Sequence, residues 1–495
     1  NYYQGWGMQY SMGEIPYYVY EFFKKGIEDG NNYYSLSQTR SRSAAFFANA
    51  TYSYKGRYTV NGTARYEGTN RMGKSRSARW LPTWNVSGAW NAHEEKFFSN
   101  LTSVLSHFTL KASYSLTADR GPADVTNSQA IITSYSPYRP FTSIQESGLY
   151  IKELENSELT YEKKHELNIG ADMGFLNNRI NLAVDWYKRN NYDLIGIVNT
   201  QGAGGQILKY ANIASMKSHG IEFTLSTKNI KTKDFNWNTD FIFSNAKNEV
   251  TDLKQNANVM ELISGNGFAK QGYPVRGLFS IPFVGLDKDG IPVIINEKGE
   301  ATSTDINFQE RQNTGFLKYE GPTDPTITGS LGNMFSYKGF RLNLFITYSF
   351  GNVIRLNPVF KAYYSDLTAM TREFKNRWTL PGDEAKTNVP AILSKRMYDS
   401  NEDLKYAYNA YNYSTERIAK GDFIRLKEIS LAYDFPKAWI NPLKLTDLSL
   451  KVQATNLFLI YADDKLNGQD PEFFNAGGVA SPVPRQFTIT LRLGL

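Results

Sequence analysis

Arginine and aromatic side chains gather at three places in this 495-residue chain where they could bind a ligand. Planar guanidinium groups and aromatic faces are the groups that hold sugars and extended peptides. The three groups are Arg71, Arg76, Arg79 and Trp80; Tyr135, Tyr138 and Arg139; and Tyr406, Tyr408, Tyr411 and Tyr413. Aromatic residues near strand ends also form the interfacial belts of membrane proteins, and loop tyrosines contact partner proteins, so each group has a structural alternative. The first two groups are the predicted substrate-binding residues.

Metal and cofactor chemistry finds little support in the residue pattern. The chain has no Cys, which excludes disulfides and thiolate metal sites. The four histidines are far apart in sequence and form no His-Glu-x-x-His pattern: His93, His107, His165 and His219. We therefore expect no metal and no cofactor, and ordinary strand and turn positions for these histidines.

Two short motifs resemble ligand-binding loops without their essential residues. Gly202-Ala203-Gly204-Gly205 lacks the Lys-Ser or Lys-Thr of a phosphate loop, which favours a flexible outer loop. Asp287-Lys288-Asp289-Gly290 begins like a calcium loop but lacks the bidentate acidic residue at the proper spacing, which favours a plain turn. A Gly-x-Ser-x-Gly elbow is absent, and 48 acidic residues single out no carboxylate pair for glycoside hydrolysis. We predict that the chain is not an enzyme.

The composition indicates which elements hold these residues. No run of about 18 apolar residues could cross a bilayer as a helix, although 41% of the residues are hydrophobic. The 33 Tyr, 30 Phe and 38 Gly suit strands, turns and aromatic belts. The net charge of +7 is spread along the chain without a basic block, so nucleic acid is not an expected partner.

Period-two alternation is the main structural signal. From Phe340 to Phe350 the residues Phe340, Leu342 and Leu344 alternate with Arg341 and Asn343, and the pattern continues to the end of the segment. The same alternation recurs at 180–187, 448–455 and 487–495. Because successive side chains of a strand point to opposite faces, each segment predicts a strand with one apolar and one polar face. Arg341, Lys451 and Arg492 fall on the polar face, where they would face a lumen or a plug.

Extending this pattern along the chain predicts about 13 antiparallel strands and an all-β fold. The predicted strands are 41–54, 58–67, 83–92, 104–117, 159–175, 179–190, 217–229, 235–248, 326–337, 340–350, 421–434, 446–456 and 485–495.

The connections between these strands alternate strictly in length. Brief or mid-length connections fall at 55–57, 93–103, 176–178, 230–234, 338–339 and 435–445, and long ones at 68–82, 118–158, 191–216, 249–325, 351–420 and 457–484. A soluble sandwich has no reason to keep this parity, whereas outer-membrane barrels join strands by short periplasmic turns and long extracellular loops. The predicted architecture is a transmembrane β-barrel, with residues 1–40 in an extracellular loop region and 41–495 forming the barrel portion.

Strand parity also predicts that the barrel is incomplete. Single-chain bacterial barrels have an even number of strands with both termini in the periplasm, whereas here the first predicted strand runs inward from an outer loop. An open sheet would expose unsatisfied amides to lipid. We therefore expect strands outside this sequence to complete the barrel, and any secretion signal to lie upstream of Asn1.

The segment from Gly421 to Tyr433 resembles the late-barrel signature of the SusC/RagA family of TonB-dependent transporters. Further segments agree in order: Arg57-Tyr58, Arg65 to Arg71, Arg79 to Trp84, Leu159 to Glu162, Tyr187 to Leu194, Asn212 to Glu222, Asn245 to Val250, Tyr337 to Phe340, Gly351-Asn352, Ala454 to Phe458, Asp470 to Glu472 and Pro484 to Phe487. The resemblance spans nearly the whole chain.

The resemblance implies a 22-stranded barrel with an N-terminal plug, as in large outer-membrane transporters, and this chain would then carry the C-terminal strands and no plug domain. It also implies a SusD-like surface lipoprotein as a lid, energy from TonB, and a dimer of transporter–lipoprotein pairs in the outer membrane of a Gram-negative bacterium. The implied function is active import of oligosaccharides or oligopeptides. Similarity of the Arg76 to Trp84 block slightly favours peptides.

Two alternatives stay open at this stage. A passive porin or adhesin-like barrel would need neither plug nor energy coupling, and a TonB box upstream would argue against it. A soluble polysaccharide-degrading β-protein would stay in solution without detergent.

Overall fold

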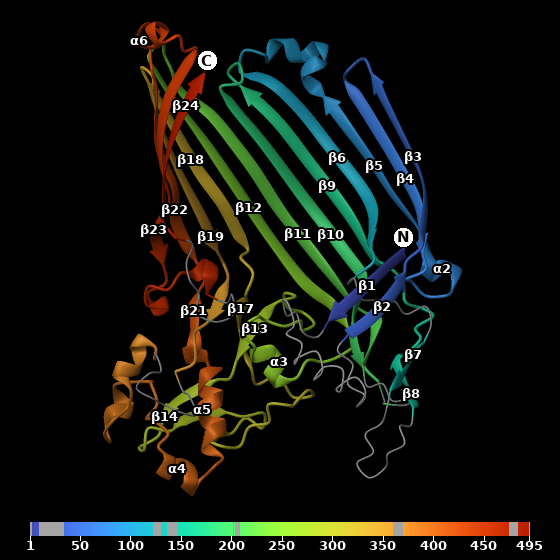
Figure 1. Ribbon diagram of the computed structural model, residues 1–495, viewed down its shortest axis with the longest axis vertical. Coiled ribbons are helices and arrows are strands. Elements are labelled where there is room, and N and C mark those ends of the chain that lie inside the picture. Colours follow the sequence, from blue (N-terminus) through green and yellow to red (C-terminus); the bar gives the residue numbers. More distant parts are fainter. Residues whose placement is uncertain are drawn as a thin grey trace, which may run out of the picture.

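A computed structural model shows a broad, curved antiparallel sheet with a layer of loops, short strands and helices at one end (Figure 1). It describes residues 2–8, 34–121, 130–135, 147–200, 202, 208–359, 370–474 and 484–494. Within these ranges no helix has the length and apolar character needed to cross a membrane.

The large sheet contains 13 strands that follow one another in chain order from β3 at one end to β24 at the other. They are β3 (Ser43–Tyr54), β4 (Tyr58–Thr69), β5 (Trp80–Asn91), β6 (Leu105–Asp119), β9 (Glu162–Phe175), β10 (Ile180–Asn199), β11 (Leu208–Lys231), β12 (Phe235–Leu253), β18 (Ile327–Tyr337), β19 (Phe340–Phe350), β22 (Phe423–Asp434), β23 (Asp447–Ala462) and β24 (Gln486–Gly494). Every strand expected from the alternation lies in this sheet, which confirms the all-β antiparallel prediction.

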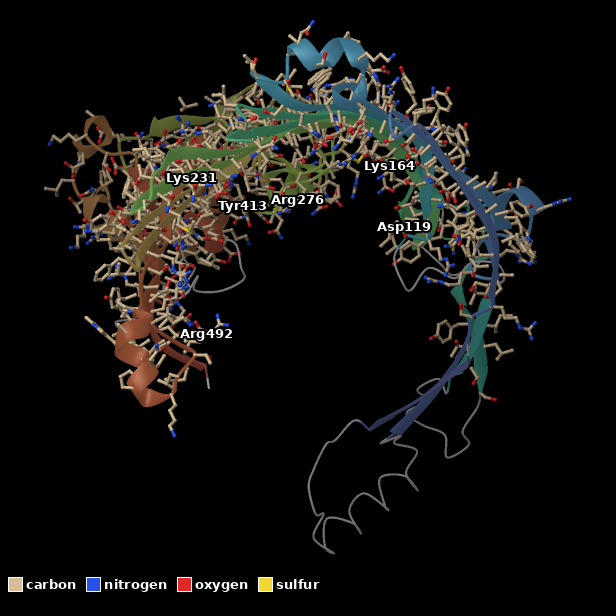
Figure 2. The ribbon with its side chains drawn as sticks, turned by 90° about the horizontal axis from the view of Figure 1, so that it is seen from above. Asp119, Lys164, Lys231, Arg276, Tyr413 and Arg492 are labelled. Atoms are coloured by element: carbon tan, nitrogen blue, oxygen red, sulfur yellow. The ribbon has the colours of Figure 1, made fainter. Side chains whose placement is uncertain are left out.

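The pairing register separates the side chains into one polar and one apolar face. Arg341 of β19 lies opposite Ala432, which lies opposite Lys451 of β23. The neighbouring row begins with Leu342 and Leu431 and is apolar. In Figure 2 the labelled Arg492 lies inside the curve of the sheet, so the polar face is concave and the apolar face convex. The predicted inward orientation of Arg341, Lys451 and Arg492 is confirmed.

The connections at the two ends of the sheet differ as expected. Tight turns join the strands at one end, and two of them use Lys55-Gly56 and Lys338-Gly339 with positive φ at both residues. This pair of left-handed residues is typical of the type I′ turns that match strand twist. A Cβ at position 339 would lie 2.8 Å from the Asp434 carbonyl oxygen, so glycine is required there. The same end carries the short helix α6 (Lys437–Ile440).

The other end of the sheet carries the loop layer, which comprises the described residues of 254–326, 351–422 and 463–474 (Figure 1). It has more regular structure than the sequence predicted. Its elements are α3 (Val259–Ile263), β13 (Gly277–Ser280), β14 (Phe283–Leu286), β15 (Pro292–Ile295), β16 (Ala301–Thr302), β17 (Lys318–Pro322), β20 (Val353–Arg355), α4 (Lys395–Ser400), α5 (Leu404–Asn412) and β21 (Ile418–Lys420), with short 3-10 helices at Arg372–Asn376, Asp383–Ala385, Thr415–Arg417, Asp464–Leu466 and Pro471–Phe473.

This loop layer has a hydrophobic core of its own. Val259, Leu262, Phe279, Ile281 and Ala410 pack together and are at most 1% exposed. The residues come from segments up to about 150 positions apart, so the long connections fold against one another and not as separate loops.

Four smaller features complete the described structure. β1 (Tyr2–Met8) pairs with β2 (Tyr34–Arg40), and β7 (Ile131–Tyr135) pairs with β8 (Gly148–Glu153). The β4–β5 connection contains the one-turn helix α2 (Arg76–Arg79), and 3-10 turns at Ala92–Glu94 and Lys96–Asn100 and at Asn441–Leu443 lie at the turn end.

Candidate functional site

Polar side chains line the concave face of the sheet between β4 and β10. A hollow of about 330 Å³ is bordered there by Asn61, Ser87, Lys111, Asn168 and Asp185, among others. The Lys111 ammonium lies 2.7 Å from a carboxylate oxygen of Asp172 on β9. Such a surface suits contact with water or with a polar ligand, in contrast to the convex face.

A second group of charges follows on the same face toward the loop layer. The carboxylate of Glu166 lies 3.1 Å from Arg189 and 2.9 Å from Lys164. Lys164 and Asp119 are labelled inside the curve in Figure 2. Positive and negative groups alternate here, so the concave face is charged without one dominant sign.

Arg355, at the end of β20, holds the loop layer together from inside. Its guanidinium donates hydrogen bonds to the carbonyl oxygens of Ser414 at 2.8 Å, Phe279 at 2.6 Å and Ile263 at 3.3 Å. Burial lowers the pKa of Arg355 to about 9, so the group stays charged at neutral pH. One buried cation thus joins the end of α3, β13 and the segment after α5.

Two further buried arginines anchor the edge of the loop layer. Arg417 is 2% exposed, pairs with Glu373 and donates to the Asn357 carbonyl at 2.7 Å. Arg425 leaves the concave side of β22 and binds both carboxylate oxygens of Asp470 at 2.5 and 2.6 Å. Two short, charge-assisted bonds between buried partners hold the 463–474 segment over the sheet.

A hollow of about 950 Å³ lies beside this anchor, between β23 and the 463–470 segment. Arg372, Arg425 and Arg485 border it together with Asp463 and Asp464. Asp470 borders it as well, so three guanidinium groups and three carboxylates give it a charged lining that a polar oligomer could use.

The first predicted ligand-binding group lies in the β4–β5 connection around α2. The Trp80 ring stacks on Tyr66 with ring centroids 5.1 Å apart, and the Arg79 Nε donates to the Gly73 carbonyl at 3.3 Å. Arg71 is half-buried and Arg76 is exposed. The structure therefore brings the four residues together on one connection, with Trp80 and Arg79 in structural contacts and Arg76 facing outward.

The second predicted group falls mostly outside the described residues. Tyr135 ends β7, and its side chain is not described. Tyr138 and Arg139 lie in the undescribed range 136–146.

The tyrosines of the third group do not share one surface. Tyr408 and Tyr411 are each 1% exposed and pack inside the loop layer, and burial raises the pKa of Tyr411 above its usual range. These two candidate rings are therefore packed inside the loop layer and do not present the exposed aromatic face that ligand stacking needs. Tyr406 is 39% exposed, and Tyr413 lies near Arg355, with 5.9 Å from the guanidinium to its ring centroid.

The histidines lie on strands and turns, but two of them meet. The His93 and His107 rings have centroids 4.1 Å apart at the turn end. His165 stacks between Tyr114 and Tyr192, with centroid distances of 5.7 and 5.6 Å. Across the ranges that the structure describes, no three His, Asp or Glu side chains gather as metal ligands would.

The Asp287 motif forms the plain turn that its sequence favours. The Asp287 carboxylate accepts hydrogen bonds from the backbone of Asp289 at 2.8 Å and of Ile291 at 2.9 Å, which links β14 to β15. Of the Gly202 to Gly205 motif, only Gly202 lies within the described residues.

The sequence does not reveal several important contacts, although the segments that make them carry the family resemblance. Asn212 donates to the Thr160 carbonyl at 2.9 Å and accepts from the Thr160 amide at 3.0 Å, and the Tyr161 hydroxyl donates to the Arg79 carbonyl at 3.2 Å. Arg425 and Asp470 likewise come from two segments that carry the family resemblance. Pairing polar residues between such segments is the signal that could have found them.

Comparisons with known proteins agree on one family. A family model described as TonB dependent receptor-like, beta-barrel matches residues 2–457. TonB-dependent receptor SusC of Bacteroides thetaiotaomicron is 26% identical in an alignment 515 residues long that covers 96% of this chain and 47% of SusC. TonB-dependent receptor P3 of Formosa agariphila is 25% identical in an alignment 446 residues long that covers 86% of this chain and 41% of P3.

Solved structures show the same fold. The RagAB peptide transporter matches with a TM-score of 0.73 and 23% identity over 93% of this chain and 48% of that chain. The chain thus spans about half the length, or less, of the relatives that it matches.

Proposed function

The chain belongs to the TonB dependent receptor-like β-barrel family, and on that premise we propose that it is part of a transporter that imports oligopeptides or oligosaccharides with energy from TonB. The family lies in the outer membrane of Gram-negative bacteria, and so does this chain, which crosses the bilayer with its strands. Its members are receptors and transporters and not enzymes, in agreement with the expectation from the motifs.

The observation that carries the proposal is the difference between the two faces of the sheet. The convex face is apolar and suits lipid, whereas the concave face carries ion pairs such as Lys111 with Asp172. At one end of the sheet lies the folded loop layer, which is anchored through Arg355 and Arg425 (Figure 1). This arrangement suits a polar passage with a structured outer rim.

Further strands and a plug of the same transporter would complete the passage. β3 and β24 stand at the two ends of the sheet, so each leaves one edge unpaired within the described structure. In hydrocarbon, each unpaired backbone group costs several kcal/mol. Summed along a strand, this cost is about as large as the free energy of unfolding of a whole domain. In this proposal an N-terminal plug occupies the concave side, and residues 1–40 belong to the outer surface.

A SusD-like lipoprotein would act as a lid on the loop layer, and two transporter–lipoprotein pairs would form a dimer. The loop layer supports this proposal because its own core makes it a firm docking platform. The alternative of a passive porin would need no lid, plug or TonB.

The substrate would be captured at the outer rim before it enters the passage. Arg76 is the exposed arginine of the first predicted group, and Arg71, Arg79, Trp80, Tyr135, Tyr138 and Arg139 remain proposed contacts. Oligopeptides are slightly favoured over glycans, because guanidinium groups pair with carboxylates and the RagAB relative is a peptide transporter.

Mass spectrometry of ligands that copurify with the intact transporter tests the substrate class. We expect a mixture of short peptides, and a mixture of glycans would overturn the preference for peptides.

Uptake of the identified ligand by cells with and without TonB tests the energy coupling. Active import predicts that uptake falls to background when TonB is deleted. Uptake that persists without TonB would support the passive porin and overturn the proposal.

A further inference from the structure

A row of three basic side chains crosses the convex face on β10, β11 and β12. Lys188 lies directly opposite His219, and His219 lies directly opposite Lys247. All three side chains are exposed. Among the described residues, none of the three takes part in an ion pair or a side-chain hydrogen bond.

The row stands at the border of the apolar band. Along β10, Ile180, Leu182, Val184 and Trp186 precede Lys188 on the convex face. Eight residues of strand span roughly 26 Å, or about 20 Å along the membrane normal at the usual tilt, close to the thickness of the lipid-facing band. Trp186 is the kind of residue that marks the interface, so Lys188 reaches the level of the lipid headgroups.

The charge of this row is not neutralised by the protein. Side chains directly opposite each other on neighbouring strands have Cβ atoms about 5 Å apart, so the His219 imidazole lies between the two lysine side chains. In the next rows outward, Lys217 lies 3.0 Å from Glu249, and Lys163 lies 2.6 Å from Asp193. Lys188 and Lys247 therefore stay available to an anion from outside the described chain, with the imidazole of His219 as a further hydrogen-bonding group between them.

The row is also confined to one part of the 13-stranded sheet, which forms the wall of the barrel. Toward the same end of the convex face, β6 carries Leu116, β9 carries Leu167, and β19 carries Phe350. β9 has two basic residues farther outward on this face, but Lys163 pairs with Asp193 and His165 stacks between Tyr114 and Tyr192. Among the described residues, the row on β10, β11 and β12 has no such partner. The local cluster points to one ligand at one place.

We propose that Lys188, His219 and Lys247 bind the phosphate of an anionic lipid in the leaflet next to the loop layer. Lysine ammonium groups and the imidazole would donate hydrogen bonds to phosphate oxygens, while Trp186 and Ile221, one row below, contact the acyl chains. Because the long connections of such barrels face outward, this is the outer leaflet, and the ligand is a phosphorylated glycolipid. An acidic protein partner would not need the adjoining apolar row.

Native mass spectrometry of the full-length transporter in mixed micelles tests this site. The probes are monophosphorylated lipid A and the same lipid after removal of its phosphate. We compare the Lys188→Gln/Lys247→Gln variant with Lys288→Gln/Lys395→Gln, which removes two exposed lysines of the loop layer. The wild type and the control should retain the phosphorylated lipid, and the first variant should bind it about 25-fold more weakly, roughly fivefold for each lysine.

Three results would overturn the proposal. The first is equal retention of the phosphorylated and dephosphorylated lipids by the wild type. The second is equal binding by both double variants. The third is evidence for a different occupant of the site. Displacement of the lipid by low millimolar inorganic phosphate would indicate a free anion, and loss of a copurifying lipoprotein from the first variant with the lipid retained would indicate a protein.

Discussion

Ile221, on the convex face, is 40% exposed, whereas Phe279 in the loop layer is 1% exposed. The two regions bury apolar side chains against different environments. The wall presents its apolar side chains to lipid and is held by its hydrogen-bond ladder. The loop layer packs around Val259, Leu262 and Ile281 like a small soluble domain.

This difference separates two kinds of sequence constraint. In the wall, each side chain must match the face on which it lies, and its exact shape matters less because lipid adapts to it. In the loop layer, each buried group needs a specific partner, as Arg355 shows with its three carbonyl acceptors. In the loop layer, a substitution should therefore destabilise only the segments that contact the changed residue. In the wall, its effect on stability should depend on the face of the sheet that carries the residue.

The largest expected effect is that of Arg355→Met. The change leaves three buried carbonyl oxygens without their donor and should destabilise the loop layer by about 4 kcal/mol, because each bond to a charged group contributes roughly 1.5–3 kcal/mol. Hydrogen exchange of the intact transporter should show faster exchange in the segments around Ile263, Phe279 and Ser414, with the wall strands unchanged.

Arg276→Met is the matched control for this prediction. Arg276 lies 2.6 Å from Asp324 in an exposed ion pair, which contributes less than about 1 kcal/mol. Equal acceleration of exchange in the two variants would contradict the role of Arg355 as an internal anchor.

The second prediction tests the wall by comparing two adjacent residues on opposite faces. Leu344→Arg places a charge in the lipid and should cost about 3 kcal/mol, whereas Asn343→Arg faces the concave side near Glu428 and should change stability by less than about 0.5 kcal/mol. Urea-dependent folding of the intact transporter into lipid vesicles measures both. A similar cost for the two would mean that the faces are assigned wrongly.

The wall could be predicted because period-two alternation depends only on neighbouring residues. The prediction failed where this signal weakens. β10 continues to Asn199 and β11 begins at Leu208, beyond the predicted limits of 190 and 217. Register shifts near Asn191 and Leu194 interrupt the alternation there, and no apolar band constrains either face.

The loop layer could not be predicted because its contacts are distant in sequence. Arg355 binds residues 59, 76 and 92 positions away. Short elements such as β13 and α5 carry little local signal, so the sequence does not reveal that Tyr408 and Tyr411 are buried. For the same reason the sequence singles out the residues around α2, which lie on one local connection, but not the buried arginine anchors, whose partners are distant in sequence.

The third prediction concerns the joint between the two regions. Asp470→Asn weakens the bond from β22 to the 463–474 segment and should destabilise that segment by about 2 kcal/mol, because a buried charge-assisted pair is lost. Hydrogen exchange in 463–474 should rise. Glu472→Gln is the control, since Glu472 is 39% exposed on its side chain and lies 3.3 Å from Arg425, and its effect should be smaller.

The smallest effect on stability is expected for Arg76→Gln, which should instead change substrate capture. Arg76 is exposed and Arg79 donates to the Gly73 carbonyl, so Arg79→Gln should cost about 1 kcal/mol of stability while Arg76→Gln leaves the melting temperature unchanged. If Arg76 contacts substrate carboxylates, its loss should weaken uptake of an acidic peptide about threefold and spare a neutral one, as expected for an exposed ion pair. Uptake of labelled acidic and neutral peptides by the intact transporter separates these outcomes. Equal uptake of both peptides by the Arg76→Gln variant and the wild type would assign this connection to structure alone.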